Sequence, residues 1–380
     1  MCEYKTIFNK MQKAFDDEHF CNKSCRGRNV KIDFINNGVF IAMVGAPGRG
    51  KSHSFSIIQS YLSRFQRNVN LYNAGDFRRV WEKEIKKHYK SNVSGFIKMC
   101  YDKKLTEERV LDTYEAELLT WLSGRSRAIP GSVFSHFKNL NEAFAQLCIK
   151  SAMAQVKSGE IIVLDATNTD VPRRDYIIQQ FKKLKKDNVN LLFIENICFN
   201  EPQLKKNFAS KLLDSDDYKK AVSDVCEPEV SKSTPLKKVI HDVITDHNLL
   251  TLPCIKLKKD FTECERVILE SMKDITTRDM GYLKKYTPMH VSIRNKSKST
   301  VYTIRQHKKK NIGYVQLLNV ICRSGSKKQH SLYTTNVENT KGNLIEYLAN
   351  VDVTKEIKAS YGQEQRVKVS KSDIETLLPK

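Results

Sequence analysis

Long apolar runs are missing from this sequence of 380 residues, and so are internal repeats and extended low-complexity segments. No run approaches the roughly 20 apolar residues that a membrane helix requires, so we expect a soluble protein without a membrane partner. The ten cysteines show no paired spacings, and a chain of this length builds a core without disulfide staples. Together these absences favour a globular protein in a reducing cytoplasm.

Acidic residues are in deficit, because 43 Asp and Glu stand against 65 Lys and Arg, for a formal net charge of +22. Such a surplus attracts anionic partners, among them nucleotides, sugar phosphates and nucleic acid. Lysine pairs often form only a solvated helix face. The charge therefore favours anionic partners but does not show which of them the protein binds.

Short apolar runs recur along the chain, separated by segments with helical periodicity. The runs are typical of buried parallel strands, and they lie at Val39–Val44, Val69–Tyr72, Ile161–Leu164 and Leu191–Ile194. Strands that alternate with helices predict an α/β fold, with a mostly parallel, doubly wound sheet flanked by helices. In such a sheet the functional residues gather at the carboxyl ends of the strands.

Changes in composition predict three parts of the chain. Residues 1–36 form a polar N-terminal lead-in, and residues 37–280 form the α/β domain, which carries a helical insertion at about 82–137. Residues 281–380 are more basic and contain short β-like runs, so we expect a small C-terminal α+β unit there.

A complete phosphate-binding loop lies between the first predicted strand and the helix that follows it. In such loops the turn wraps around the β-phosphate, the lysine reaches the β- and γ-phosphates, and the Ser or Thr hydroxyl coordinates Mg²⁺. The sequence therefore predicts a site for ATP and Mg²⁺ formed by Gly45, Ala46, Pro47, Gly48, Arg49, Gly50, Lys51 and Ser52.

A carboxylate, Asp165, stands directly after the predicted strand Ile161–Leu164. In P-loop phosphotransferases an acid at this place serves the metal or the attacking hydroxyl; a helix N-cap is the other interpretation. Two arginine pairs, Arg78-Arg79 and Arg173-Arg174, also follow strand ends. Guanidinium groups bind phosphate in a fork geometry that lysine lacks, although each pair is also compatible with a solvated surface.

Three motifs in order resemble the 6-phosphofructo-2-kinase/fructose-2,6-bisphosphatase family: Gly45–Ser52, Asn73–Arg79 and Asp165–Arg174. The resemblance covers roughly residues 38–290. It implies a P-loop kinase fold and the transfer of the γ-phosphoryl group of ATP, with Mg²⁺, to fructose 6-phosphate. Whether the chain forms a homodimer is left open.

The resemblance also implies roles for single residues. Cys198 ends a strand that resembles one near the nucleotide in the family, although a cysteine there is more often a buried apolar residue. The implied catalytic residues are Asp165, Lys51 and Cys198; Asn207 and Lys211 would join the phosphate loop around ATP; Arg78, Thr167, Arg173 and Lys211 would hold the sugar phosphate; Ser52 and Asp165 would bind the metal.

The sequence also departs from the family pattern. The stretch Glu142–Cys148 lacks an arginine that the family uses for the sugar phosphate. Val301–Lys308 is a broken copy of the segment that opens the family's phosphatase, with Gln306 interposed before His307. Too little sequence follows for the rest of such a domain. We therefore expect no bisphosphatase activity, with His307 a surface residue.

Two alternatives stay open. The net charge of +22 is compatible with a polynucleotide kinase-like enzyme, although no basic platform with interleaved aromatic residues of the kind that binds single strands is evident, so nucleic acid is not the favoured partner. The missing sugar-phosphate arginine is compatible with a catalytically impaired nucleotide-binding regulator.

Overall fold

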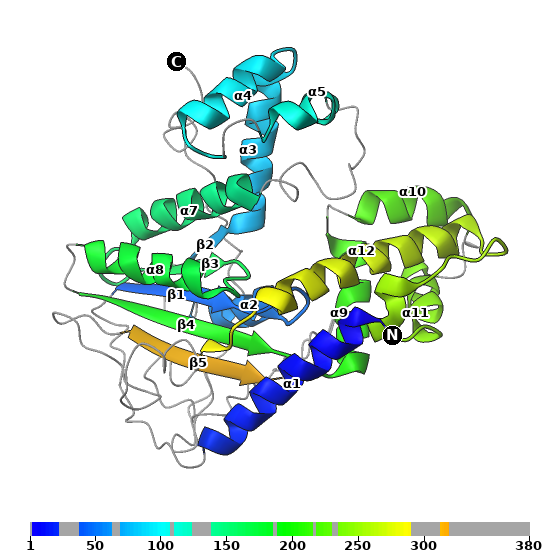
Figure 1. The fold of residues 1–380 in the computed structure, drawn as a ribbon. Coiled ribbons are helices and arrows are strands. Elements are labelled where there is room, and N and C mark those ends of the chain that lie inside the picture. Colours follow the sequence, from blue (N-terminus) through cyan, green and yellow to red (C-terminus); the bar gives the residue numbers. More distant parts are fainter. Residues whose placement is uncertain are drawn as a thin grey trace.

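The computed structural model describes residues 2–22, 38–62, 69–106, 110–123, 138–184, 188–215, 218–229, 235–289 and 312–318. Within these ranges helices flank a parallel sheet, as Figure 1 shows, so the predicted α/β class is confirmed. The strands are β1 (Gly38–Val44), β2 (Val69–Asn73), β3 (Ile161–Asp165), β4 (Val189–Ile197) and β5 (Ile312–Leu318).

The described strands pair in the order β2-β3-β1-β4-β5, and every pairing is parallel. All residues of β1, β3 and β4 are buried, because helices cover both faces of the central strands and leave no polar face. This explains why the strands appear in the sequence as continuous apolar runs. The predicted runs therefore correspond to β1, β2, β3 and β4.

The strand register brings the chemically important residues to one edge of the sheet. Asn73, the last residue of β2, pairs with Asp165, the last residue of β3. On the other side of β1, Val44 pairs with Glu195. Helices α2 (Lys51–Leu62), α3 (Ala74–Tyr89), α8 (Val171–Lys183) and α9 (Glu201–Asp214) begin shortly after the four strand ends. Their first turns therefore lie at the carboxyl edge.

The helical insertion leaves the sheet along α3, which leads to the outlying α4 (Val93–Asp102) and α5 (Glu115–Leu122) (Figure 1). Its base is fixed because Trp81 of α3 packs against Phe144 of α7, with ring centroids 5.9 Å apart. The short 3-10 turn η2 (Asp112–Tyr114) directly precedes α5, and α7 (Lys138–Gln155) follows the insertion.

A second group of helices packs together beyond the other side of the carboxyl edge (Figure 1). It combines α9 with α10 (Lys219–Glu229), α11 (Leu236–Thr245), the 3-10 helix η3 (Leu249–Cys254) and α12 (Glu263–Lys285). Helix α12 begins with a capping box in which Thr262 and Glu265 bond to each other's backbone N–H groups. It extends past the boundary predicted at residue 280.

The N-terminal lead-in is an integral part of the core. Helix α1 (Glu3–Asn22) packs against α12 and η3, and its side chains Tyr4, Phe8 and Met11 are buried. Burial of side chains of this size stabilises the fold by about 1.5–3 kcal/mol each. The sequence showed a polar segment without a motif, because α1 presents only one apolar stripe to its neighbours.

The expectation of a chain without disulfides is wrong. Cys2 and Cys254 form one disulfide, with their Cα atoms 6.1 Å apart, and Cys226 and Cys264 form another at 4.7 Å. The first joins the residue that precedes α1 to η3, and the second joins α10 to α12. Because 252 and 38 residues separate the partners in sequence, cysteine spacing gave no signal of either pair.

Part of the predicted C-terminal unit extends the main sheet, since β5 pairs along its whole length with β4. The remaining residues of that unit, including Val301–Lys308 with His307, lie outside the described residues apart from the end of α12 and the segment that follows it to Met289. The predicted domain limits therefore stay predictions. Among the described helices, none combines the length and the hydropathy needed to span a bilayer.

Candidate active site at the carboxyl edge of the sheet

The phosphate loop connects β1 to α2 and is held tightly from behind. Gly48 has a φ of +74°, which favours glycine, and a Cβ atom there would lie 2.2 Å from Cε1 of Phe208. The side-chain amide of Asn207 donates to the Gly48 carbonyl oxygen at 2.6 Å. Helix α9 therefore supports the turn with both a ring and a hydrogen bond.

Lys51 folds back over its own loop. Its Nζ donates to the carbonyl oxygens of Gly45 at 2.9 Å and Ala46 at 3.0 Å. Burial lowers the pKa of Lys51 to about 8; nearby Lys211 acts in the same direction, while Asp165 opposes the shift. Both of these acceptors are neutral backbone carbonyls, so they do not neutralise the ammonium group, and its positive charge can bind an anion.

Ser52 and Asp165 connect the phosphate loop to the end of β3. The Ser52 hydroxyl donates to Oδ2 of Asp165 at 2.7 Å, and the Asn73 side-chain amide donates to the same oxygen at 3.1 Å. The side-chain oxygen of Asn73, Oδ1, accepts hydrogen bonds from the backbone N–H groups of Gly75 and Asp76 and so caps α3. One asparagine thus fixes both α3 and the carboxylate.

The turn after Asp165 is bonded directly to the phosphate loop. The Thr167 carbonyl oxygen accepts from the Gly45 N–H at 2.8 Å. Asn168, at a φ of +45°, donates its side-chain amide to the Met43 carbonyl oxygen at 2.8 Å. These two bonds hold half-buried Thr167 beside the loop.

Cys198, Asn207 and Lys211 lie on the α9 side of the loop. Lys211 is near enough to Lys51 to lower its pKa. Cys198 is fully buried at the end of β4, and burial raises the pKa of its thiol. This environment keeps Cys198 a neutral thiol behind the loop.

The arginines at the strand ends have different environments. Arg174 is buried and donates to the carbonyl oxygens of Asn168, Thr169 and Thr287, so it ties the turn after β3 to the end of α12. Arg78 pairs with Glu82 at 3.2 Å, and Arg79 pairs with Asp76.

Arg173 forms a bidentate pair with Glu142, with Nε 2.9 and 3.0 Å from the two carboxylate oxygens and Nη2 also bonded to Oε2. Glu142 lies in the second turn of α7. A short connection joins the end of α7 to the start of β3, so the beginning of α7 lies near the carboxyl edge of the sheet. Arg173, in the first turn of α8, lies at the same edge. The guanidinium group that the sequence assigned to a sugar phosphate is thus paired with a carboxylate of the protein itself.

The structure therefore brings Gly45–Ser52, Asp165, Thr167, Asn207 and Lys211 together around one turn. Sequence reasoning placed Asn73 in the second motif without giving it a role, and it missed the partner of Arg173. Asn73 carried a signal, because it is the last residue of a strand at the same edge. Glu142 carried none, because its partner is 31 residues away.

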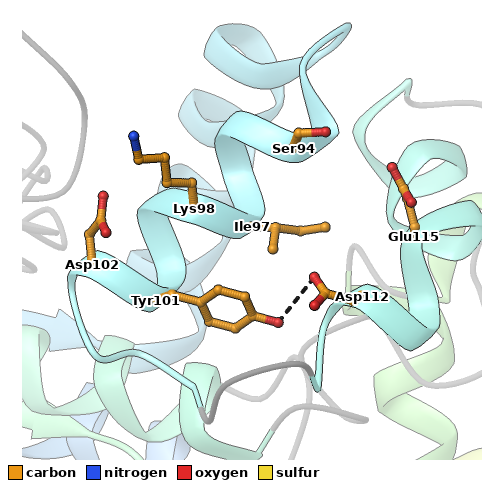
Figure 2. Close-up of a pocket in the computed structure, with 7 residues that line it drawn as sticks. All are labelled: Ser94, Ile97, Lys98, Tyr101, Asp102, Asp112 and Glu115. Atoms are coloured by element: carbon orange, nitrogen blue, oxygen red, sulfur yellow. Dashed lines mark hydrogen bonds between the residues drawn. The ribbon is translucent and has the colours of Figure 1, made fainter.

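A separate hollow of about 330 Å³ lies in the helical insertion (Figure 2). The Tyr101 hydroxyl donates to Oδ1 of Asp112 across it at 3.3 Å. None of the predicted site residues lines this hollow, so it is distinct from the phosphate loop. Its lining residues are Ser94, Ile97, Lys98, Tyr101, Asp102, Asp112 and Glu115.

A parallel sheet whose first strand runs into a Gly-rich turn, with an Asp on the neighbouring strand bonded to the loop's Ser, defines the class of P-loop α/β proteins. Within that class, residues 135–232 match the family model described as 6-phosphofructo-2-kinase. The chain is thus similar to 6-phosphofructo-2-kinases over this part, and the resemblance predicted from the three motifs is confirmed.

Curated relatives from three organisms illustrate the similarity. The chain is 29% identical over 180 residues, 47% of its length, to the "Probable 6-phosphofructo-2-kinase" of Schizosaccharomyces pombe, of which this covers 21%. It is 23% identical over 279 residues, 73% of its length, to the 6-phosphofructo-2-kinase/fructose-2,6-bisphosphatase of Aquarana catesbeiana, of which this covers 50%. For 6-phosphofructo-2-kinase/fructose-2,6-bisphosphatase 3 of Homo sapiens the identity is 25% over 201 residues, 50% of the chain and 29% of the relative. The chain thus spans half or less of these relatives.

Proposed function

We propose that this protein transfers the γ-phosphoryl group of ATP to the 2-hydroxyl of fructose 6-phosphate and so produces fructose 2,6-bisphosphate. The observation that carries the proposal is the 2.7 Å hydrogen bond between Ser52 and Asp165. It joins the loop that would hold the nucleotide to the carboxylate that would face the acceptor. The three motifs and the names of the relatives support the same reaction.

The oxygen donors at the loop suit Mg²⁺. The Ser52 hydroxyl and the Asp165 carboxylate are hard oxygen ligands, and Mg²⁺ in phosphotransferases binds one or two protein oxygens together with phosphate oxygens. When bound, Mg²⁺ offsets the charge on the phosphates. Asn73 holds the Asp165 carboxylate in place at 3.1 Å, so little reorganisation is required of it.

The remaining residues have electrostatic and positioning roles. Lys51 would move from the carbonyl oxygens of Gly45 and Ala46 to the β- and γ-phosphates, where its charge stabilises the transferring group. Asp165 would also accept the proton of the attacking hydroxyl. Asn207 and Lys211 would border the nucleotide, Cys198 would lie beneath it, and Arg78, Thr167 and Arg173 would hold the acceptor's phosphate.

A substrate screen tests this proposal. The protein is incubated with labelled ATP, Mg²⁺ and a panel of sugar phosphates and RNA 5′ ends, and the labelled product is identified. Label on fructose 6-phosphate supports the proposal. Label on RNA ends instead, with binding that weakens steeply as salt rises, contradicts it in favour of a polynucleotide kinase-like enzyme. We also expect no release of phosphate from fructose 2,6-bisphosphate.

One observation favours a second candidate, a nucleotide-binding regulator with impaired catalysis. Arg173 is paired with Glu142 on both carboxylate oxygens, and Arg78 and Arg79 have carboxylate partners as well. An acceptor phosphate must compete with these anions. ATP binding without phosphotransfer to any acceptor in the same screen would select the regulator.

A further inference from the structure

Arg49 belongs to the phosphate loop, yet its side chain is buried, with 2% of its surface exposed. Its Nη1 donates to the Pro47 carbonyl oxygen at 2.7 Å and to Oδ1 of Asp279 at 2.6 Å. The guanidinium carbon also lies 6.0 Å from the centre of the Phe208 ring. The loop's own arginine therefore points into the protein and joins the loop backbone to α12.

Asp279 is completely buried in α12. A carboxylate in such a place is strongly unfavourable unless it is paired and its oxygens accept hydrogen bonds. Arg49 supplies the opposite charge to Oδ1, and the Tyr4 hydroxyl donates to Oδ2 at 2.5 Å. Burial alone would lower the pKa of Arg49, but the charge of Asp279, its hydrogen bond and the neighbouring Tyr4 together outweigh this effect, so the pKa of Arg49 is raised and the guanidinium stays charged.

Tyr4 brings helix α1 into the same network. Its side chain is fully buried; burial, with the charge of Asp279 added, raises the pKa of Tyr4 well above its ordinary value, so the hydroxyl remains a donor. The helix is fixed to its neighbours by the Cys2–Cys254 disulfide and by the T-shaped contact of Phe8 with Phe199, at 5.1 Å between ring centroids.

We propose that Tyr4 and Asp279 are positioning residues of the nucleotide site, which hold the phosphate loop in its binding conformation through Arg49 and so make α1 a part of that site. A glycine-rich loop is conformationally permissive, and a loop that is ordered before the ligand arrives binds more tightly. The inference rests on the proposed function, because it takes Gly45–Ser52 as the ATP site.

Calorimetric titration of the full chain with ATP and Mg²⁺ tests the inference, with a thermal melt of every variant. Tyr4→Phe keeps the ring and removes the donor, and Asp279→Asn removes the charge. Each replacement should weaken ATP binding about tenfold, measured at a temperature where the variant is fully folded. The reason is that loss of one hydrogen bond to a charged group lowers an affinity by about a factor of ten. The KM of the phosphoryl acceptor should stay unchanged.

Glu3→Gln is the matched control on the same helix. Glu3 pairs with Lys284 at 2.9 Å, but both side chains are largely exposed, so its loss should leave the affinity for ATP as in the natural sequence. If this control weakens ATP binding as much as Tyr4→Phe does, the loss of affinity results from weaker attachment of α1 and not from the hydrogen bonds that join Tyr4, Asp279 and Arg49. That result would overturn the inference.

The two possible failures are distinguishable. If the unmodified chain binds no ATP, the proposed function fails. If the unmodified chain binds ATP and folded Tyr4→Phe binds it equally well, only the inference fails, and the network serves stability alone. Should Asp279→Asn not fold, Tyr4→Phe decides the question, because it preserves the buried ion pair.

Discussion

The Ser52 hydroxyl donates to Oδ2 of Asp165 at 2.7 Å, although 113 residues separate the two in sequence. The replacement Asp165→Asn keeps the shape of the side chain and removes its charge. We predict that phosphotransfer falls ~10²–10⁴-fold, the range that an acid–base group contributes. The measurement is kcat with labelled ATP.

Glu160→Gln is the control for this replacement, because Glu160 directly precedes the same strand at the opposite edge of the sheet. Its activity should match that of the unmodified chain. Retained activity in Asp165→Asn would remove this carboxylate from the mechanism.

Lys51 gives the nucleotide site a pH dependence. Because burial lowers the pKa of Lys51 to about 8 in the free protein, the ammonium form predominates below that pH and the neutral form above it. The phosphates of ATP favour the charged form, so affinity should decline as the pH rises through about 8. In that range binding should also take up a proton, which titration calorimetry in buffers of different ionisation enthalpy measures.

Lys51→Arg provides the comparison, since a guanidinium stays protonated throughout this range. Its binding can be weaker, but the decline near pH 8 should disappear. If the decline persists in Lys51→Arg, another group titrates and the assignment to Lys51 is wrong.

Glu142 competes with an acceptor phosphate for Arg173, at distances of 2.9 and 3.0 Å from Nε. Both side chains are partly exposed, and such an ion pair contributes up to ~1 kcal/mol, or about fivefold in an equilibrium. Glu142→Gln should therefore lower the KM for fructose 6-phosphate up to about fivefold. The KM for ATP should not change.

Glu117→Gln removes the same charge from the exposed face of α5 and controls for the net charge of the protein. A KM for fructose 6-phosphate that is unchanged or higher in Glu142→Gln would show that Arg173 does not contact the acceptor.

Gly48 and Gly281 allow the effect of an added methyl group to be compared between the phosphate loop and an open position on α12. A Cβ at Gly48 would overlap Phe208, at a backbone conformation that only glycine adopts easily, whereas a Cβ at Gly281 would meet nothing within 4 Å. Gly48→Ala should destabilise the fold by roughly 1–3 kcal/mol and weaken ATP binding. Gly281→Ala, inside α12, should stabilise it by roughly 0.5–1 kcal/mol. Denaturant unfolding measures both, and equal effects would contradict the account of the loop.

The sequence predicted those parts of the molecule that depend on local pattern. The strands could be found because burial on both faces leaves continuous apolar runs such as Ile161–Leu164. The phosphate loop could be found because its chemistry requires a fixed spacing from Gly45 to Ser52. Asp165 followed from its place at a strand end.

The remaining features depend on partners that are distant in sequence. Tyr4 is 275 residues from Asp279, and Asp279 is 230 residues from Arg49, so no spacing indicated that the polar lead-in supports the phosphate loop. The pairing of Arg173 with Glu142 depends on the packing of α7 against α8. The two disulfides likewise follow from how α1, α10 and α12 pack.

The position of the transferred phosphoryl group tests the central claim most directly. The protein is incubated with ATP, Mg²⁺ and fructose 6-phosphate, and the products are followed by ³¹P NMR, with Lys51→Met as the inactive control. We predict a new phosphate resonance on the anomeric carbon of the sugar, formed in step with ADP and absent with Lys51→Met. ATP that is merely hydrolysed, or a sugar spectrum that does not change while ATP binds, would contradict the account.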